Sequence, residues 1–277
     1  DDGYTTQTPQ NAFGIIDVVN EAGREEAMTF TNTRESGTLA LSKALRGNAT
    51  DGEKEFTFRV KLENARFDTA TQRDAYDVVI REANKADVQT TVARDANGEY
   101  VLTLKGGQTA TLLDVLYGTT ATVAEDDYTA EGYEAVSTQT AAVNSQTPDA
   151  AVAFTNERYI GSIEITKALA GTGSDKGYGK TFTFDVKLWN EHDLDLLNEK
   201  TSTMPSGVDG LTKTNEQRDG HDVYAGTVSI TMGADGQPVS ASITNIPAHT
   251  RYEIVERDYT DDGYTTQTPQ NAFGIID

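Results

Sequence analysis

Three polar side chains interrupt rows of alternating apolar residues in this chain, and their types could support amide chemistry. Lys43, Glu125 and Asn156 each continue the inward face of a strand-like segment. A lone charge is costly to bury unless it is paired or neutralised. We therefore expect the three residues to meet in one core.

Burial would change what these groups can do. Desolvation lowers the pKa of a lysine towards the neutral, nucleophilic amine and raises the pKa of a glutamate, which can then stay protonated. Such an acid could polarise an asparagine carboxamide while the amine attacks it and ammonia leaves, giving a Lys–Asn isopeptide bond. A buried Lys–Glu salt bridge with asparagine as hydrogen-bond partner is the simpler alternative.

The same residue types recur further along the chain. Lys167 and Glu256 interrupt two later apolar rows, and Asn32 interrupts an earlier one. Asn32 and Asn156 both end the phrase Phe-Thr-Asn, and each stands 11 residues before a lysine of these sets. The recurrence predicts a second set of the same kind.

The elements that carry these residues alternate with a period of two, which is typical of half-buried strands. Turn signals such as Asp-Ala-Asn-Gly (95–98) separate the strands. The pattern predicts an all-β chain of repeated antiparallel β-sandwiches. The expected strands include 39–45, 56–62, 163–169 and 182–188, and short helices are expected at 71–84 and 191–199.

Internal repeats set the expected domains. Residues 1–17 recur unchanged as 261–277, an offset of 260, and a weaker repeat has an offset of 131. One interpretation is a tandem array, in which the two identical segments should superpose; a duplicated cloning boundary is the other. In the array, 1–34 are the last strands of a preceding domain and 35–157 a complete domain. Residues 158–277 are then a domain that lacks its last strand, which the equivalent of 18–34 from the next repeat would complete.

Composition excludes several classes of function. The chain has 277 residues, 44 acidic and 23 basic side chains, and no cysteine. A net charge of −21 argues against nucleic acid as a partner, and no apolar run is long enough for a membrane span. Without cysteine there is no disulfide and no thiolate nucleophile.

The ordered motifs resemble a known family. Three motifs are similar to the Cna B-type domains of Gram-positive adhesins and pilins: the Lys-Ala-Leu that begins at Lys43 and at Lys167, the V-x-E-x-D-Y run around Glu125, and the Phe-Thr-Asn phrase. The resemblance implies an inverse immunoglobulin-like sandwich, autocatalytic isopeptide bonds and a role in a cell-wall-anchored stalk. The sequence Leu116-Tyr117-Gly118 departs from it, because the family usually has proline there.

Carried over by position, the resemblance implies one complete set and one divided set. Lys43 and Asn156 would be joined, with Glu125 as proton shuttle. Lys167 and Glu256 would be completed by Asn32 of a neighbouring copy.

Other polar residues carry weaker signals. His192, His221 and His249 have no spacing that suggests a metal site, so we expect surface histidines, and no cofactor or metal is expected. Asp193, Asp195 and Glu199 resemble a solvated face. The remaining acidic turns could hold calcium but are expected to be solvated: Asp126, Asp127, Asp258, Asp261 and Asp262.

The sequence thus predicts a structural stalk repeat of an extracellular, cell-wall-anchored surface fibre. Its partners would be neighbouring repeats of the same protein, and a host ligand could bind elsewhere in the full protein. The alternative is a ligand-binding adhesin module that recognises host protein or glycan, for which Trp189 and the tyrosines could form a platform. An enzyme with turnover is not expected, because the reactive set would be consumed in one self-directed event.

Overall fold

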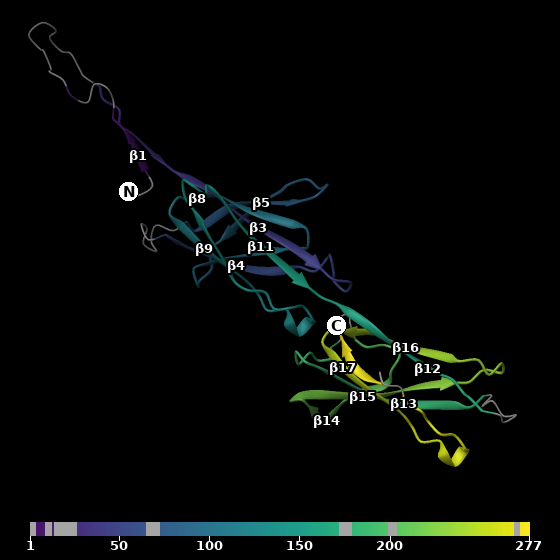
Figure 1. Cartoon of the computed structure of the whole chain (residues 1–277). Helices are drawn as coiled ribbons and strands as arrows, with labels where there is room; N and C mark the ends of the chain where they lie inside the picture. Colours follow the sequence, from purple (N-terminus) through teal and green to yellow (C-terminus); the bar gives the residue numbers. More distant parts are fainter. Residues whose placement is uncertain are drawn as a thin grey trace, which may run out of the picture. The chain divides into compact units, whose positions relative to one another are not determined.

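The computed structural model describes residues 4–8, 13, 27–64, 73–171, 179–198, 204–268 and 272–277. It is an all-β structure apart from two short 3-10 helices, as predicted (Figure 1). The chain forms two compact units: 1–44, 52–126 and 136–155 make the first, and 45–51, 127–135 and 156–277 make the second. Within the described ranges, no helix is both long and apolar enough to cross a membrane.

The first sandwich consists of two sheets whose strands are antiparallel except for the pair β3–β11. One sheet has the order β11-β3-β8-β5-β6 and the other β10-β9-β4-β7. Its strands are β3 (Ser36–Arg46), β4 (Phe56–Asn64), β5 (Ala75–Glu82), β6 (Val88–Ala93), β7 (Glu99–Leu104), β8 (Gln108–Leu116), β9 (Thr119–Glu125), β10 (Gln139–Val143) and β11 (Asp149–Glu157). The 3-10 helix η1 (Thr129–Glu131) belongs to the second unit.

Strict alternation of buried residues builds the core of this sandwich. On β3, Leu39 and Leu41 are fully buried, and on the facing sheet Phe56, Phe58 and Val60 are fully buried as well. Burying side chains of this size contributes about 1.5–3 kcal/mol each. The polar residues of interest therefore sit in an apolar layer that is already closed.

The last strand of the first sandwich runs beside its first strand in the same direction. The backbone N–H of Thr38 donates to Pro148 O at 2.8 Å, and that of Arg158 donates to Arg46 O at 3.0 Å. The residue numbers increase along both strands in the same direction, from 38 to 46 and from 148 to 158, so the β3–β11 pair is parallel. This pairing sets which residues of the two strands lie level with each other.

The second sandwich repeats part of this plan. Its sheets have the orders β12-β16 and β14-β15-β13-β17-β18. Its elements are β12 (Ile160–Lys167), β13 (Thr181–Asn190), β14 (Asp209–Arg218), β15 (His221–Thr231), β16 (Val239–Pro247), β17 (Thr250–Glu256), η2 (Thr260–Asp262) and β18 (Phe273–Ile276). In the described part of the chain, β12 pairs with β16 alone, whereas β3 lies between β8 and β11.

The two identical segments do not adopt one structure. Residues 4–7 form β1 (Tyr4–Gln7), which pairs with β2 (Thr31–Arg34), but residues 264–267 form no strand. There the ring of Tyr264 packs edge-on against Phe182 at 5.3 Å. The expectation that the segments superpose is wrong for these residues, because the first copy pairs with β2 while the second packs against the core of the second sandwich. Residues 14–17 lie outside the described ranges.

The two expected helices are also absent where the chain is described. Residues 75–82 of the first are β5, and residues 191–198 of the second form turns. The run Val78-Val79-Ile80 is β-branched, which favours a pleated strand over a helix. The acidic and alanine residues around this run do not overcome that preference.

Gly37 lets β11 approach β3 closely. A Cβ at this position would lie 1.9 Å from the carbonyl oxygen of Pro148, a backbone atom that cannot move aside cheaply. A Cβ at Gly52, by contrast, would meet nothing within 4 Å. The first and last strands can therefore pair at this end only if residue 37 has no side chain.

We predict that Gly37→Ala lowers the free energy of unfolding by about 1–3 kcal/mol, the usual cost of overpacking. Gly52→Ala is the matched control and should change stability by less than about 0.5 kcal/mol. Chemical denaturation of both variants measures the difference. Equal stability of the two would show that β11 does not need the close approach.

Candidate functional site

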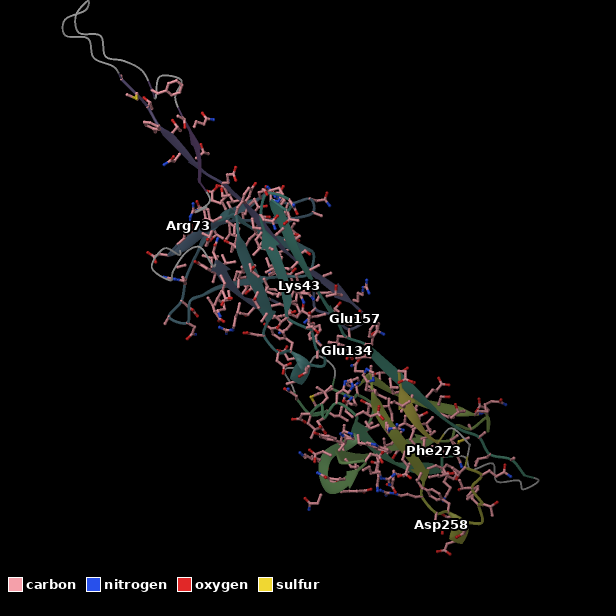
Figure 2. All side chains as sticks on the ribbon, turned by 60° about the vertical axis from the view of Figure 1, so that its left-hand side comes forward. Lys43, Arg73, Glu134, Glu157, Asp258 and Phe273 are labelled. Atoms are coloured by element: carbon pink, nitrogen blue, oxygen red, sulfur yellow. The ribbon has the colours of Figure 1, made fainter. Side chains whose placement is uncertain are left out.

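Lys43 lies in the core as predicted from the sequence. The residue is 2% exposed, on the same face of β3 as Leu39 and Leu41, and Figure 2 labels it among the strands of the first sandwich. Its Nζ atom is 4.0 Å from the ring centre of Phe56 and 5.9 Å from that of Phe58. Aromatic rings thus replace most of the water that an ammonium group normally has.

Glu125 reaches the lysine from the opposite sheet. It ends β9, where it lies opposite Phe58 of β4 in the strand register. Lys43 Nζ donates a hydrogen bond to Glu125 Oε1 at 2.9 Å, and the two side chains are 0% and 1% exposed. The structure therefore brings the predicted lysine and glutamate into direct contact across the sandwich.

Asn156 lies on the inward face of the neighbouring strand. Residues 150, 152, 154 and 156 of β11 are all buried, and Asn156 is 1% exposed. The parallel hydrogen bonds place Lys43 level with Phe154, so Asn156 is one inward position further along β11. Diagonal neighbours on one face of a sheet are about 7–8 Å apart, which is within reach of a long side chain.

The ring of Phe154 helps to enclose this region. It packs edge-on against Phe58 with 5.2 Å between the ring centres. Alternation predicts a lysine among inward-facing leucine and phenylalanine side chains, and the structure shows which rings line its pocket.

The second sandwich holds a matching Lys–Glu pair. Lys167 Nζ donates to Glu256 Oε1 at 2.5 Å, and Nζ lies 4.3 Å from the ring centre of Phe182. Glu256 lies opposite Phe184, just as Glu125 lies opposite Phe58. The side chains are slightly more accessible, at 12% and 6%.

Asn32 is placed differently from Asn156. It lies on β2, opposite Thr6 of β1, and is exposed. Within this single chain it is on a two-stranded sheet that does not include Lys167. Its pairing with Lys167 of another copy stays a prediction.

The environment of Lys43 favours a neutral amine more than water does. Burial lowers the pKa of the Lys43 ammonium, and the hydrogen bond and charge of Glu125 offset part of that shift. Because Nζ and Oε1 are already hydrogen-bonded, one proton transfer along this bond would give an amine beside a carboxylic acid. The pair can thus act as a nucleophile with its own acid and base.

A sequence family covers almost all of these elements. The family described as "Domain of unknown function (DUF7601)" matches residues 37–158 and again residues 161–277. The chain belongs to this family. The first match contains Lys43 and Glu125, and the second contains Lys167 and Glu256.

Individual relatives are pilus proteins. The chain is 29% identical over 153 residues to a pilin of Streptococcus pyogenes, a match that spans 49% of this chain and 43% of the pilin. The chain therefore covers less than half the length of that relative. The predicted similarity to Gram-positive pilin and adhesin domains is confirmed.

Solved structures that match part of the chain are also pilus proteins. The major pilin of S. pyogenes is 25% identical, with 50% of this chain and 53% of the pilin covered and a TM-score of 0.38. A pilus-presented adhesin is 24% identical, with 47% of this chain and 30% of that chain covered and a TM-score of 0.35. The fold itself is defined by the strand order and pairing of the two sandwiches.

The acidic turns that could have held calcium are used in other ways. Asp126 pairs with Arg59 at 2.9 Å and Asp262 with Lys180 at 2.6 Å. Asp127 and Asp258 each accept the backbone N–H of the residue two positions later. These contacts agree with solvated turns, as expected.

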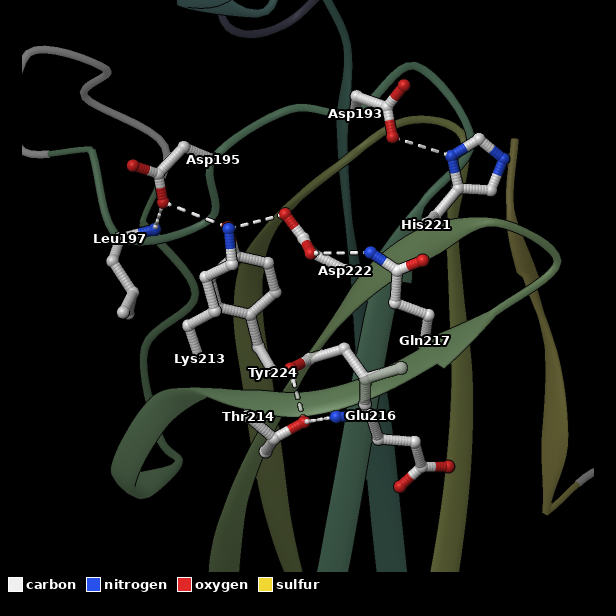
Figure 3. A network of polar contacts seen from close by, with 11 residues as sticks. Asp193, Asp195, Leu197, Lys213, Thr214, Glu216, Gln217, His221, Asp222 and Tyr224 are labelled. Carbon is white, nitrogen blue, oxygen red and sulfur yellow. Dashed lines mark hydrogen bonds and ion pairs between the residues drawn. The ribbon is translucent and has the colours of Figure 1, made fainter.

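The charged face of the second sandwich is a network of surface contacts. Figure 3 shows Asp222 between Lys213 and Gln217, and Tyr224 OH donating to Asp195 at 3.1 Å. His221 is paired with Asp193 at 2.7 Å. Glu199 lies outside the described residues. His192 and His249 are not separate surface residues, however, since their rings stack with centres 4.3 Å apart.

We predict that the cost of Glu125→Ala comes mainly from leaving Lys43 buried without a counter-charge. Removing one member of a buried pair costs about 3–5 kcal/mol, whereas replacing both members by apolar residues is often neutral. Lys43→Met combined with Glu125→Leu should therefore unfold at higher denaturant concentration than Glu125→Ala. Neither variant can form a Lys43–Asn156 bond through this pair, so the comparison isolates the buried charge. Equal midpoints would mean that Lys43 carries no charge in the Glu125→Ala variant.

Proposed function

We propose that this chain is a structural repeat of a bacterial surface fibre and that its first sandwich cross-links itself between Lys43 and Asn156. The observation that carries the proposal is the fully buried Lys43–Glu125 pair, with Asn156 on the adjacent strand of the same face. If Lys43 and Glu125 formed only a stabilising salt bridge, the pair would not need the buried carboxamide of Asn156 beside it.

The proposed reaction exchanges one amide for another. The neutral amine of Lys43 attacks the side-chain carbonyl carbon of Asn156, a new C–N bond forms, and the bond to the asparagine Nδ2 breaks. Glu125 accepts the proton that the attacking amine loses and returns a proton to the leaving nitrogen, which departs as ammonia. The glutamate is unchanged and no oxidant, metal or cofactor is consumed.

The position of the bond explains why it would benefit a fibre. It would join the first strand of the sandwich to the last and close almost the whole module into a covalent loop. A disulfide that closes a loop of about 100 residues stabilises by about 4.7 kcal/mol in the chain-entropy account, and an isopeptide bond constrains the unfolded chain in the same way. Tension applied at the two ends would pass through the bond without separating the sheets.

We propose that the second sandwich is completed by another copy. Lys167 and Glu256 are already paired, and β12 has β16 as its sole described neighbour. The segment that ends in Asn32 would add beside β12 in the place that β11 takes beside β3, by strand addition to an open edge. The donor is the next repeat, whether continued in one longer chain or supplied by a second molecule.

The relatives support the surface role at a coarser level. They are pilus subunits and a pilus adhesin, which are structural proteins of the cell surface. By this likeness we place the chain outside the cell, in a wall-anchored fibre whose main partners are further repeats, and we expect no catalytic turnover.

The alternative, an adhesin module that binds a host protein or glycan, has less support. Trp189 is 7% exposed and its ring is covered by the guanidinium of Arg218 at 5.2 Å. It therefore offers no open platform for a sugar. Among the described residues, the exposed aromatic side chains come from four separate parts of the sequence: Phe13, Phe30, Tyr159 and Phe273.

We predict that proteolytic digestion of the purified chain yields a branched peptide containing both Lys43 and Asn156. In Glu125→Ala the branch should be absent and the first sandwich should melt at a lower temperature, because the proton shuttle is missing. Asp126→Ala, which removes the neighbouring surface carboxylate, should retain the branch. Linear peptides from the unaltered chain would reduce the site to a polar cluster, and a branch in Glu125→Ala would exclude Glu125 from the reaction.

We also predict that concentrated protein slowly forms species that stay joined on a denaturing gel. They should disappear in Lys167→Ala and in Asn32→Ala, each of which removes one end of the intermolecular bond. Lys43→Met should still form them, since its pocket serves the first sandwich alone. Joined species that survive both alanine substitutions would contradict strand donation between copies.

A further inference from the structure

Three potential metal ligands from separate parts of the sequence converge in the second unit. One ligand atom each from Glu134, His192 and His249 lies within 4.8 Å of the others, and no other such group occurs among the described residues. His249 Nε2 is 3.1 Å from Glu134 Oε1. The sequence spacing gave no sign of this cluster, because it depends on the fold.

His249 occupies a backbone position that ordinarily suits glycine. Its φ angle is +61°, in the left-handed region, which glycine adopts freely and which asparagine, aspartate and histidine adopt more often than other residues. The equivalent turn in the first sandwich has Gly118, with a φ angle of +87°. The second sandwich thus carries an imidazole at a turn where the first sandwich has no side chain.

A buried asparagine fixes both histidine-bearing turns. Asn190 is 3% exposed; its Oδ1 accepts the backbone N–H of His192 at 2.9 Å. Its Nδ2 donates to Ala248 O and to Thr250 Oγ1, each at 2.9 Å, on the two sides of His249. One side chain thus ties together the backbones of the two turns that carry the stacked imidazoles.

Glu134 is also held by its backbone. Its backbone N–H donates to Glu157 O at 2.9 Å, and its side chain contacts His249. Figure 2 labels Glu134 on the segment that follows η1. The Glu134 and His249 side chains are 43% and 36% exposed, so an ion from solution can reach them.

The three ligands border a hollow. It has a volume of about 330 Å³, and its lining also includes Tyr133, Tyr159 and Leu194. Water inside it could fill the remaining positions around a cation. The site therefore combines three convergent ligand atoms with open space beside them.

We propose that Glu134, His192 and His249 bind one divalent transition-metal ion of the zinc class. Two imidazoles and one carboxylate suit zinc, whereas calcium and magnesium prefer oxygen ligands. Zinc–ligand bonds of about 2.1 Å put tetrahedral ligand atoms roughly 3.4 Å apart, so the cluster needs only a small closure. The bound ion would tie residues 129–135 to the two histidine turns and stabilise the unit they share.

The test is calorimetric titration of zinc into the whole chain after removal of metals with a chelator. We expect one ion per chain. His192→Ala and His249→Gly should each weaken binding by at least about 10-fold, the smallest effect typical even of supporting residues. His249→Gly restores the residue type of Gly118, so its turn will fold without strain.

His221→Ala is the matched control, since His221 also has an acidic partner, Asp193, but is outside the cluster. Its zinc affinity should be unchanged, and in the unaltered chain the ring signals of His192 and His249 should shift on zinc addition while those of His221 do not. Zinc binding that is absent, or equally tight in all three variants, would overturn the proposal.

Discussion

A lysine side chain enclosed by phenylalanine rings is the constraint on which the first sandwich depends. Lys43 Nζ is removed from water, so its charge must be balanced or lost, and Glu125 accepts a hydrogen bond from it. That contact joins the two sheets, because the lysine comes from β3 and the glutamate from β9. A sandwich that needed only stability would be served as well by two apolar residues. The presence of a Lys–Glu pair in both sandwiches therefore supports the proposed cross-linking role.

Much of this site could be predicted from alternation alone. The inward positions of Lys43, Glu125 and Asn156 follow from counting every second residue along three strands. The contact between lysine and glutamate followed from the energetic argument that buried charges pair. Alternation also places phenylalanines on the inward faces of these strands. Which rings surround Lys43, and how β11 is offset against β3, depend on how the two sheets stack and on the close approach at Gly37.

Two different physical causes explain the failures of prediction. The segment 4–7 forms a strand while its identical copy at 264–267 does not, and 75–82 forms a strand despite its helix-favouring neighbours. For 4–7 the strand partner available in three dimensions decided the outcome, whereas for 75–82 the β-branched run Val78-Val79-Ile80 outweighed its neighbours. His192 and His249 show the same limit, since residues so far apart in the sequence were brought together by Asn190 and the turns it fixes.

The intact mass of the purified chain tests the central claim most directly. Each isopeptide bond removes one ammonia, and the account requires one intramolecular bond, in the first sandwich, while the second waits for a strand from another copy. The monomer should therefore be lighter than its sequence mass by one ammonia, and Asn156→Ala should have its full sequence mass. A monomer at full sequence mass would contradict self-cross-linking, and a loss of two ammonia molecules would contradict the dependence of Lys167 on a neighbouring copy.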